Sequence, residues 1–343
     1  MRAAARRVSA LLLAGLAGCA GGAEGASVSG ELLELERLEF VPAAPSFLTD
    51  HSFLGLLDRF ADVSLERALV VDRFEVTRGD VLRWGLGAAS GGTSSVGFVT
   101  DGAQVSSKTR DWPAYLTFAE ARELGALRGM RLPTPKEWLY VATGGRGYQY
   151  PYHQSTPQSG FANTRDLKLG RPAIVGSFEK GRSKAFGCYD LHGNVWEWVD
   201  GVVPGRNDIG VLLESATDPR TQVEDQLASA MGGSYQSPTQ RTFQRAFGSF
   251  PITFLAKLLD KRTLRPDVGA RHVADAETYL LARAGRWGDD RESRARVRAV
   301  GAVWADTVGR GRVVSFLEGL GDEGDVPVGI TRLLEGARGE GGR

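Results

Sequence analysis

The residues best suited to chemistry lie in the segment Gly187–Trp198, which reads Gly-Cys-Tyr-Asp-Leu-His-Gly-Asn-Val-Trp-Glu-Trp. A Gly-Asn turn lies between Asp190 and Glu197, so two carboxylates and several loop carbonyls come together, as a hard cation prefers. If the chain is extended here, Trp196 and Trp198 point to the same side and anchor the turn. Taken alone, the segment is explained better by a buried aromatic turn with two surface carboxylates. Other segments must therefore decide between the two interpretations.

Several further segments accompany this one along the chain. They are Leu38–Ala43, Phe74–Thr77, Arg131–Trp138 with Gly144-Gly145 and Tyr150–Tyr152 after it, Gly232–Tyr235 and Val268–Arg271. In this order they resemble the motifs of the formylglycine-generating enzyme (sulfatase-modifying factor) family, although Arg78 stands where the family usually has Asn. The resemblance covers residues 36–275. It implies an α+β, loop-rich, elaborated C-type-lectin-like fold.

The resemblance also implies a specific activity, for which this chain lacks the ligands. Active members of the family oxidise a substrate cysteine with copper that two of their own cysteines hold, because soft thiolates select Cu(I). The matching positions here are Ser237 and Thr242. A hydroxyl stays protonated at neutral pH and binds Cu(I) poorly, and Cys188 belongs to a different motif. We therefore expect no copper, no formylglycine-generating oxidase activity and no catalytic residue at these degenerate positions.

The sequence also shows no pattern of another catalytic centre. The four histidines are His51, His153, His192 and His272, and no two of them have the spacing of a helical metal-binding pair. We interpret His192 and His272 as structural or exposed. Ser237 has no histidine partner in a recognisable triad pattern.

Calcium is the metal that the resemblance supports. One family site uses the side chain before the Gly-Asn turn, two turn carbonyls and the following glutamate, which correspond here to Asp190, Gly193, Val195 and Glu197. A second site begins at Asn163 and the carbonyl of Thr164, but the acidic ligands that follow in the family are not evident in this chain. Calcium in these sites would hold loops together.

The N-terminus has the pattern of a secretion signal. Arg2, Arg6 and Arg7 precede an apolar stretch that is too short to span a bilayer, and Leu-Ala-Gly precedes Cys19. This pattern predicts a bacterial lipoprotein whose mature chain begins at a lipidated Cys19. The alternative is an ordinary signal peptide with a chance cysteine. Since no Asp follows Cys19, we expect an anchor in the outer membrane that faces the periplasm.

Composition limits the remaining classes of function. Only Cys19 and Cys188 are present, so lipidation of the first leaves no internal disulfide, and we interpret Cys188 as a small buried hydrophobe. The formal net charge is +1 with 24% charged residues, which indicates no nucleic-acid partner.

Local patterns divide the chain into four parts: a signal peptide (1–18), a lipidated cysteine with a flexible tether (19–35), the family domain (36–275) and a helical C-terminal appendage (276–343). Capping boxes at Thr134–Glu137 and Thr117–Glu120 predict two helices in the domain. Residues 86–110 and 203–230 read as surface insertions. In the appendage, helices are expected at 289–308, 313–320 and 330–334.

Together these observations predict a lipid-anchored envelope protein whose domain is a non-catalytic, calcium-stabilised module that binds or assembles an envelope protein or peptide. The alternative is an oxidoreductase that works without the cysteine pair and tailors a secreted peptide. Its ligand groove would be lined by Trp196, Tyr235, Ser237 and Arg241. A third possibility is recognition of sulfatase-like peptides without conversion.

Overall fold

The computed structural model describes residues 28–44, 65–85, 107–144, 150–152, 160–201, 226–242, 249–251, 256–321 and 326–339, without the side chains of 240–242 and 249–251. Its helices and strands, in chain order, are α2 (Val28–Glu36), β1 (Leu38–Val41), β2 (Leu69–Asp72), α3 (Arg78–Arg83), α4 (Phe118–Leu127), α5 (Pro135–Thr143), η4 (Arg165–Leu167), η5 (Glu179–Gly181), β3 (Trp196–Trp198), β4 (Leu227–Met231), β5 (Gln240–Thr242), β6 (Ser249–Pro251), β7 (Ala256–Asp260), β8 (Val268–Gly269), β9 (Val273–Asp275), α7 (Ala276–Arg283), η8 (Ala284–Arg286), α8 (Arg291–Val308), α9 (Arg310–Gly319) and α10 (Val328–Arg338).

An antiparallel sheet of order β1-β2-β9 separates two hydrophobic cores. Strands alternate their side chains between the two faces of a sheet. Accordingly Phe40 and its cross-strand partner Val70 lie in a core shared with the C-terminal helices. Val71 and its partner Val273 lie on the other face, in a core that contains α5. Strands β1 and β2 are buried on both faces, which explains why their residues other than Glu39 and Asp72 are apolar.

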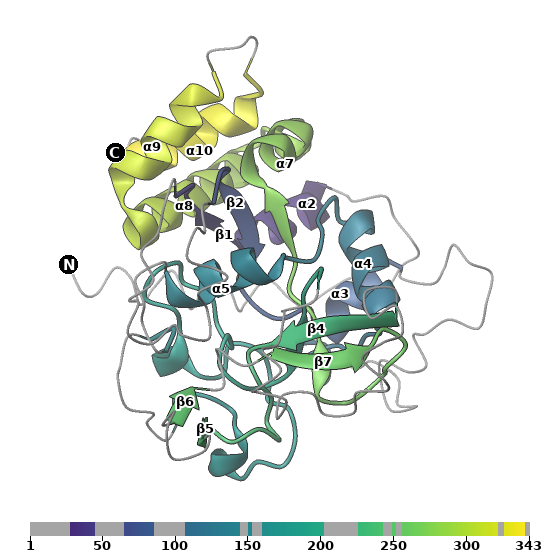
Figure 1. Ribbon diagram of the computed structural model, residues 1–343. Helices are drawn as coiled ribbons and strands as arrows, with labels where there is room; N and C mark the ends of the chain where they lie inside the picture. Colours follow the sequence, from purple (N-terminus) through teal and green to yellow (C-terminus); the bar gives the residue numbers. More distant parts are fainter. Residues whose placement is uncertain are drawn as a thin grey trace.

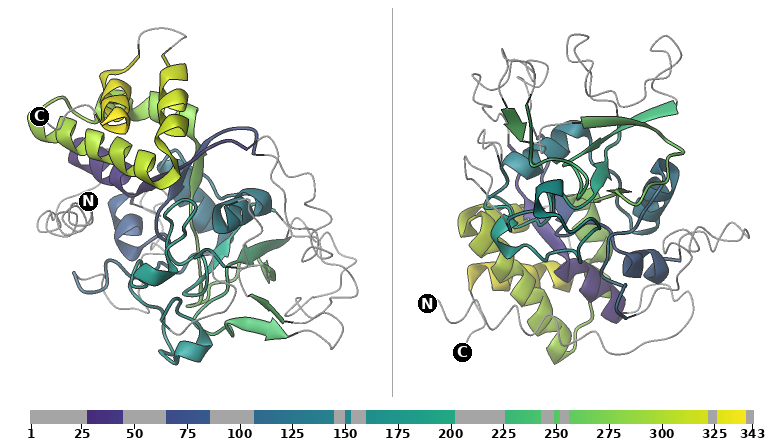
Figure 2. Two further views of the ribbon diagram at one scale, coloured as in Figure 1. Left: turned by 90° about the vertical axis from the view of Figure 1, so that its left-hand side faces the viewer. Right: turned by 90° about the horizontal axis from the view of Figure 1, so that it is seen from below.

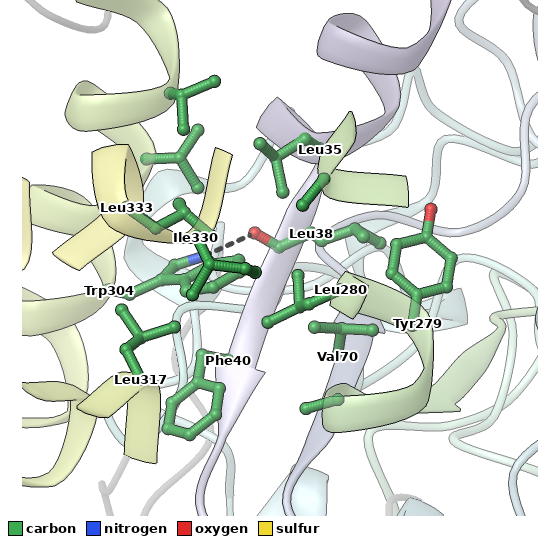
Figure 3. Close-up of a cluster of buried hydrophobic side chains, with 14 of the residues drawn as sticks. Leu35, Leu38, Phe40, Val70, Tyr279, Leu280, Trp304, Leu317, Ile330 and Leu333 are labelled. Atoms are coloured by element: carbon green, nitrogen blue, oxygen red, sulfur yellow. Dashed lines mark hydrogen bonds between the residues drawn. The ribbon is translucent and has the colours of Figure 1, made fainter. Parts of the chain in front are cut away.

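The C-terminal helices pack directly on this sheet. Figure 3 shows Trp304 of α8 against β1, where its indole Nε1 donates a hydrogen bond to the carbonyl of Leu38 at 3.0 Å. Ile330 and Leu333 of α10 belong to the same buried cluster as Leu38. In Figure 1 helices α7–α10 form a layer at the top of the molecule, opposite the hairpin β5–β6. The helices expected near 289–308, 313–320 and 330–334 are thus α8, α9 and α10.

Residues 28–35 do not form the flexible tether that the sequence suggested. They lie in helix α2, whose Leu32 and Leu35 are 2% and 1% exposed in the core of the helical layer. Its acidic face is also buried: Glu31 pairs with Arg283 at 2.7 Å, and Glu34 pairs with Arg128. Residues 28–35 are therefore part of the folded domain. The remainder of the expected tether, with Cys19 and the signal segment 1–18, lies outside the described residues.

A second sheet of order β7-β4-β3-β8 carries the tryptophans of the Gly187–Trp198 segment. Strand β3 is antiparallel to β4 and parallel to β8. Trp196 and Trp198 lie in one hydrophobic cluster, as the extended pattern predicted. The ring of Phe118 in α4 meets that of Trp198 edge-on, with centroids 5.7 Å apart. Figure 2 shows this strand-rich part on the side away from α7–α10.

Both predicted capping boxes are present, at the starts of α4 and α5. Helix α5 ends at Gly144, whose φ of 64° is the left-handed conformation that glycine adopts without strain. A third capping box, Thr77 with Asp80, begins α3. Within the described residues, no helix is long and apolar enough to cross a membrane. The insertions expected at 86–110 and 203–230 fall largely outside the described residues.

Candidate functional site: the buried Gly-Asn turn

The turn at Gly193-Asn194 is closed by a neighbouring loop. Asn194 donates its backbone N–H to the carbonyl of Asn163 at 2.8 Å, and both turn residues have positive φ values. A Cβ at position 193, where φ is 92°, would lie only 2.5 Å from that carbonyl oxygen. Glycine is therefore required here both for its backbone conformation and for the close approach of the two loops.

Glu75 supports the turn from the opposite side. Its Oε1 accepts the backbone N–H of Val195 at 3.0 Å, and its Oε2 accepts Nδ2 of Asn194 at 2.5 Å. The amide oxygen of Asn194 accepts Nδ2 of Asn163 at 3.0 Å and the N–H of Ala173 at 2.8 Å. Glu75 was not among the site residues predicted from the sequence. Its position in the family motif Phe74–Thr77 was the sequence feature that could have indicated a role for Glu75 in the site.

The carboxylate of Glu197 is bound by two neighbouring side chains. Its carboxylate pairs with Arg271, with Nη2 and Oε1 2.6 Å apart, and its Oε2 accepts Nε1 of Trp138 at 2.6 Å. Arg271 also donates to the carbonyls of Asp72 and Tyr189, each at 2.7 Å. An arginine thus already neutralises Glu197, one of the residues expected to bind calcium.

Asp190 lies in the same buried region. Its Oδ2 accepts the N–H of Gly176 at 2.7 Å. Burial, with the nearby charge of Glu197, raises the pKa of Asp190 to about 6. Burial also raises the pKa of Glu75 well above its usual value, and Asp190 and Glu197 add to that shift. The cluster thus holds more carboxyl groups than Arg271 alone can neutralise.

Among the residues expected to bind calcium, Asn163 has the side chain best placed to act as a ligand. Both hydrogen bonds of its Nδ2 go to acceptors, the carbonyl of Arg171 and Oδ1 of Asn194, which fixes the orientation of the amide. Its Oδ1 is buried and has no hydrogen-bond partner. A cation or a water molecule would satisfy this oxygen. Thr164, whose carbonyl is the other expected ligand, contacts Thr239 through its side chain, with the two hydroxyl oxygens 2.7 Å apart.

The residues expected to bind calcium thus lie close together, but they belong to two different sets of contacts. Asn163, Gly193 and Val195 meet at the turn, whereas Glu197 belongs to a neighbouring ion pair. Across the described ranges, no group of three or more His, Cys, Asp or Glu side chains has the arrangement of a metal site. Any calcium at the turn would therefore need mainly amide, carbonyl and water oxygens.

The position of the family's first copper cysteine is occupied by a hydrogen-bonded serine. Oγ of Ser237 accepts the backbone N–H of Ser234 at 3.1 Å, and the two serine hydroxyls lie 3.3 Å apart. Oγ of Ser234 in turn lies 3.4 Å from Oδ2 of Asp267. These are hard oxygen groups, so the donor set does not fit Cu(I). Thr242 lies in β5, and its side chain is outside the described set.

Cys188 offers no substitute for the missing thiolates. Its side chain is completely buried, and burial raises its pKa to about 12. It therefore remains a neutral thiol among the apolar residues that pack around α5, as expected for a small hydrophobe.

Three of the four residues of the expected ligand groove have buried side chains. Trp196 and Tyr235 are 6% and 7% exposed, Ser237 is 8% exposed, and the side chain of Arg241 is not described. One cavity, of about 260 Å³, lies at Arg131 and Glu137, and another, of about 650 Å³, lies over α4.

The two described histidines are structural. His192 packs edge-on against Tyr150, with ring centroids 5.2 Å apart, and burial lowers its pKa to about 3. His272 contacts Arg128 through Nδ1 and the carbonyl of Ala121 through Nε2, each at 2.8 Å. Since arginine can only donate, Nδ1 must accept and Nε2 must carry the proton. His272 is thus a neutral imidazole in a fixed tautomer.

The order of these motifs along the chain is that of a sulfatase-modifying-factor type of domain. The model of the "Sulfatase-modifying factor enzyme 1-like domain" matches residues 59–258, more than half of the chain. The chain therefore belongs to this family.

Individual relatives match shorter stretches. The chain is 38% identical over 88 residues to the hercynine oxygenase of Mycolicibacterium thermoresistibile, covering 24% of this chain and 19% of the relative. It is 36% identical over 92 residues to the inactive C-alpha-formylglycine-generating enzyme 2 of Bos taurus, covering 24% and 31%. Its matches thus span about a fifth to a third of the length of these relatives. Among solved structures, PvdO from Pseudomonas aeruginosa aligns over 69% of this chain and 94% of that one, with 18% identity and a TM-score of 0.47.

Proposed function

We propose that this protein is a lipid-anchored envelope protein whose sulfatase-modifying-factor domain is a non-catalytic binding or assembly module. Its partner would be an envelope protein or peptide. The domain would be an elaborated C-type-lectin-like fold, in which loops on a rigid base recognise the partner.

The main observation behind the proposal is that a serine occupies the position of the family's first copper-binding cysteine. Ser237 stands there with its hydroxyl in a hydrogen-bonded pair with Ser234, and Cys188 is a buried neutral thiol in a different motif. Cys19 is the only other cysteine in the sequence. If it is lipidated, no pair of thiolates can assemble in one molecule. The similarity to a relative that is named inactive agrees with this proposal.

Calcium is proposed as a structural ion at the Gly-Asn turn. The unpartnered Oδ1 of Asn163 would be one ligand, with carbonyl oxygens of Thr164, Gly193 and Val195 as further candidates. Asp190 could add a carboxylate, since cation binding favours its charged form. Glu197 is not part of this set because Arg271 neutralises it. Bound calcium would hold the 163 loop against the turn.

The second candidate is an oxidoreductase that works without the cysteine pair. The similarity to hercynine oxygenase favours it, because that relative is named as an oxygenase. Tyr235 and Trp196 would contact its peptide substrate. The near-complete burial of both side chains favours the binding module instead.

One experiment separates the two candidates. The full chain is incubated with a sulfatase-derived cysteine peptide, oxygen, a reductant and either Cu(I) or Fe(II), and oxidised peptide is measured by mass spectrometry. The binding module predicts no oxidation with either metal. Oxidation that depends on the protein would contradict it. An active formylglycine-generating enzyme is the positive control, and denatured protein is the negative one.

A further inference from the structure

Helix α2 lies close in sequence to the proposed lipid anchor. Helix α2 starts at Val28, nine positions after Cys19. Even a fully extended segment of this length spans only about 30 Å. If Cys19 carries the lipid, the N-terminal end of α2 must therefore remain within that distance of the membrane surface. The anchor thus restricts which face of the domain can approach the bilayer.

The surface at this end of α2 carries exposed apolar groups. Val28 is 46% exposed and lies beside Gly288, where a Cβ would be 2.7 Å from Cγ1 of Val28. Val328 begins α10 and, at 53%, is the most exposed large apolar side chain in the described part of the chain. The next residue, Gly329, packs so closely on Ala284 of η8 that a Cβ would lie 2.4 Å from its carbonyl oxygen. Both valines therefore border the segment 284–288.

A cationic side chain lies in the same segment. Arg286 is the last residue of η8, and its side chain is 63% exposed. It reaches back to the buried Glu31 of α2 at 3.4 Å, so it marks the junction between α2 and the C-terminal helices. We refer to Val28, Arg286 and Val328 together as the η8 surface.

We propose that the η8 surface is the membrane-contacting face of the anchored protein. The inference rests on the proposed lipid anchor at Cys19. Moving exposed aliphatic side chains from water into the interfacial region of a bilayer is favourable, and an arginine among them is attracted to anionic headgroups. Three such residues are too few to bind a membrane by themselves. They suffice to orient a domain that the lipid already holds within reach, because tethering makes the contact intramolecular.

This orientation directs the candidate site away from the membrane. The helical layer that contains the η8 surface and the β5–β6 hairpin lie at opposite ends of the molecule (Figure 1). Ser237 lies three residues before β5, and its backbone carbonyl accepts the N–H of Arg165 in η4 at 2.8 Å. Helix η4 therefore belongs to the end of the molecule that carries the candidate site. A partner in the periplasm would meet this end first.

Spin labels can test the orientation on the full lipidated chain. Val328→Cys places a label on the η8 surface, and Leu169→Cys places one beside η4, where the native side chain is 44% exposed. Cys188 does not compete for the label, because it is buried with a pKa of about 12. Each variant is reconstituted in vesicles of phosphatidylethanolamine and phosphatidylglycerol. The accessibility of the label to dissolved oxygen and to a water-soluble nickel chelate is then compared with and without vesicles.

The proposal predicts that vesicles shift the label at position 328 toward oxygen and away from the nickel complex by several fold, while the label at 169 keeps its solution values. Equal accessibility at both positions, or protection at 169 alone, would overturn it. Flotation of the wild-type chain and of Cys19→Ala tests the anchor separately. If the wild-type chain does not float, the anchor is wrong and the proposal fails with it. If the chain floats and only the label result fails, the anchor stands without this orientation.

Discussion

Arg271 and Glu197 form a buried ion pair, with Nη2 of the arginine 2.6 Å from Oε1 of the glutamate and each side chain 1% exposed. Trp138 of α5 donates its indole N–H to the same carboxylate. This one carboxylate therefore joins three motifs that are far apart in the sequence: Arg131–Trp138, Gly187–Trp198 and Val268–Arg271. The pair fixes β3 relative to the end of β8, and so it positions the Gly-Asn turn.

Removing Glu197 should destabilise the fold strongly. Glu197→Ala leaves Arg271 as an unpaired buried cation, and breaking a buried pair in this way typically costs about 3–5 kcal/mol. The free energy of unfolding can be measured with urea by tryptophan fluorescence. Asp260→Ala is the matched control, because it breaks an ion pair with Arg262, whose side chain is 86% exposed. If both variants unfold at the same urea concentration, the structural role assigned to Glu197 is incorrect.

The protonation of Asp190 should make stability fall as pH rises. Its pKa is about 6 in the fold, against 3.8 as the ordinary value. The protonated form is thus favoured in the native state. Its contribution is fully present below pH 3.8 and is lost as the pH rises through about 6. The shift corresponds to about 2–3 kcal/mol.

Asp190→Asn should remove this dependence, because asparagine keeps a hydrogen-bond acceptor and tolerates the positive φ of 59° at this position. Urea unfolding in a chelating buffer at a series of pH values between 4 and 7 would measure it. We expect the variant to be more stable than the wild type at pH 7 and similar to it at pH 4. Parallel stability profiles would show that Asp190 does not titrate as described.

His272 should remain neutral well below the ordinary histidine range. Burial and the neighbouring Arg128 lower its pKa to about 4, from 6.5. Its contribution to stability is therefore present above pH 6.5 and is lost as the pH falls toward 4. An NMR titration of the imidazole should show the Nε2–H tautomer and no protonation at pH 5.5. Protonation near pH 6.5 would contradict the buried network around Arg128.

His272→Gln provides the control for that network. Glutamine can donate to the carbonyl of Ala121 and accept from Arg128, as the neutral imidazole does. This variant should retain most of the stability at pH 7. His272→Leu can do neither, and it should be less stable because Arg128 loses one buried acceptor.

Helix α2 should behave as part of the core. Leu35 is 1% exposed among residues of the helical layer, so Leu35→Ala should cost about 2–5 kcal/mol. Val28→Ala at the exposed start of the same helix should change stability by about 0.5 kcal/mol or less. Thermal or urea unfolding of the two variants measures the difference. Equal, small effects would restore the view that residues 28–35 are a tether.

Local signals in the sequence predicted much of the fold. The capping boxes at Thr117 and Thr134 determine where α4 and α5 begin, because each depends on contacts within four residues. The apolar alternation around Trp196 likewise predicted its burial. The tether prediction for residues 28–35 was wrong because long-range ion pairs, which no local pattern shows, hold the helix that these residues form. The partners of its acidic residues, Arg283 and Arg128, lie 252 and 94 positions away in the chain.

The site was harder to predict for the same reason. Motif order alone indicated that Asp190 and Glu197 lie near one turn, but not that Arg271 neutralises the second of them. Glu75 reaches Val195 across 120 positions, a contact that no local pattern encodes. The loss of a copper-binding thiolate at Ser237 could be predicted from the sequence alone, since it depends only on residue type.

The metal content of the full chain, purified under native conditions and analysed by inductively coupled plasma mass spectrometry, tests the account most directly. A non-catalytic module without a thiolate pair predicts neither copper nor iron at stoichiometric level, in the wild type as in Cys188→Ala. Ser237→Cys combined with Thr242→Cys, reconstituted with Cu(I), is the matched variant in which copper retention should rise. Stoichiometric copper or iron in the wild-type protein would contradict the account, because it would require a redox centre built from other residues.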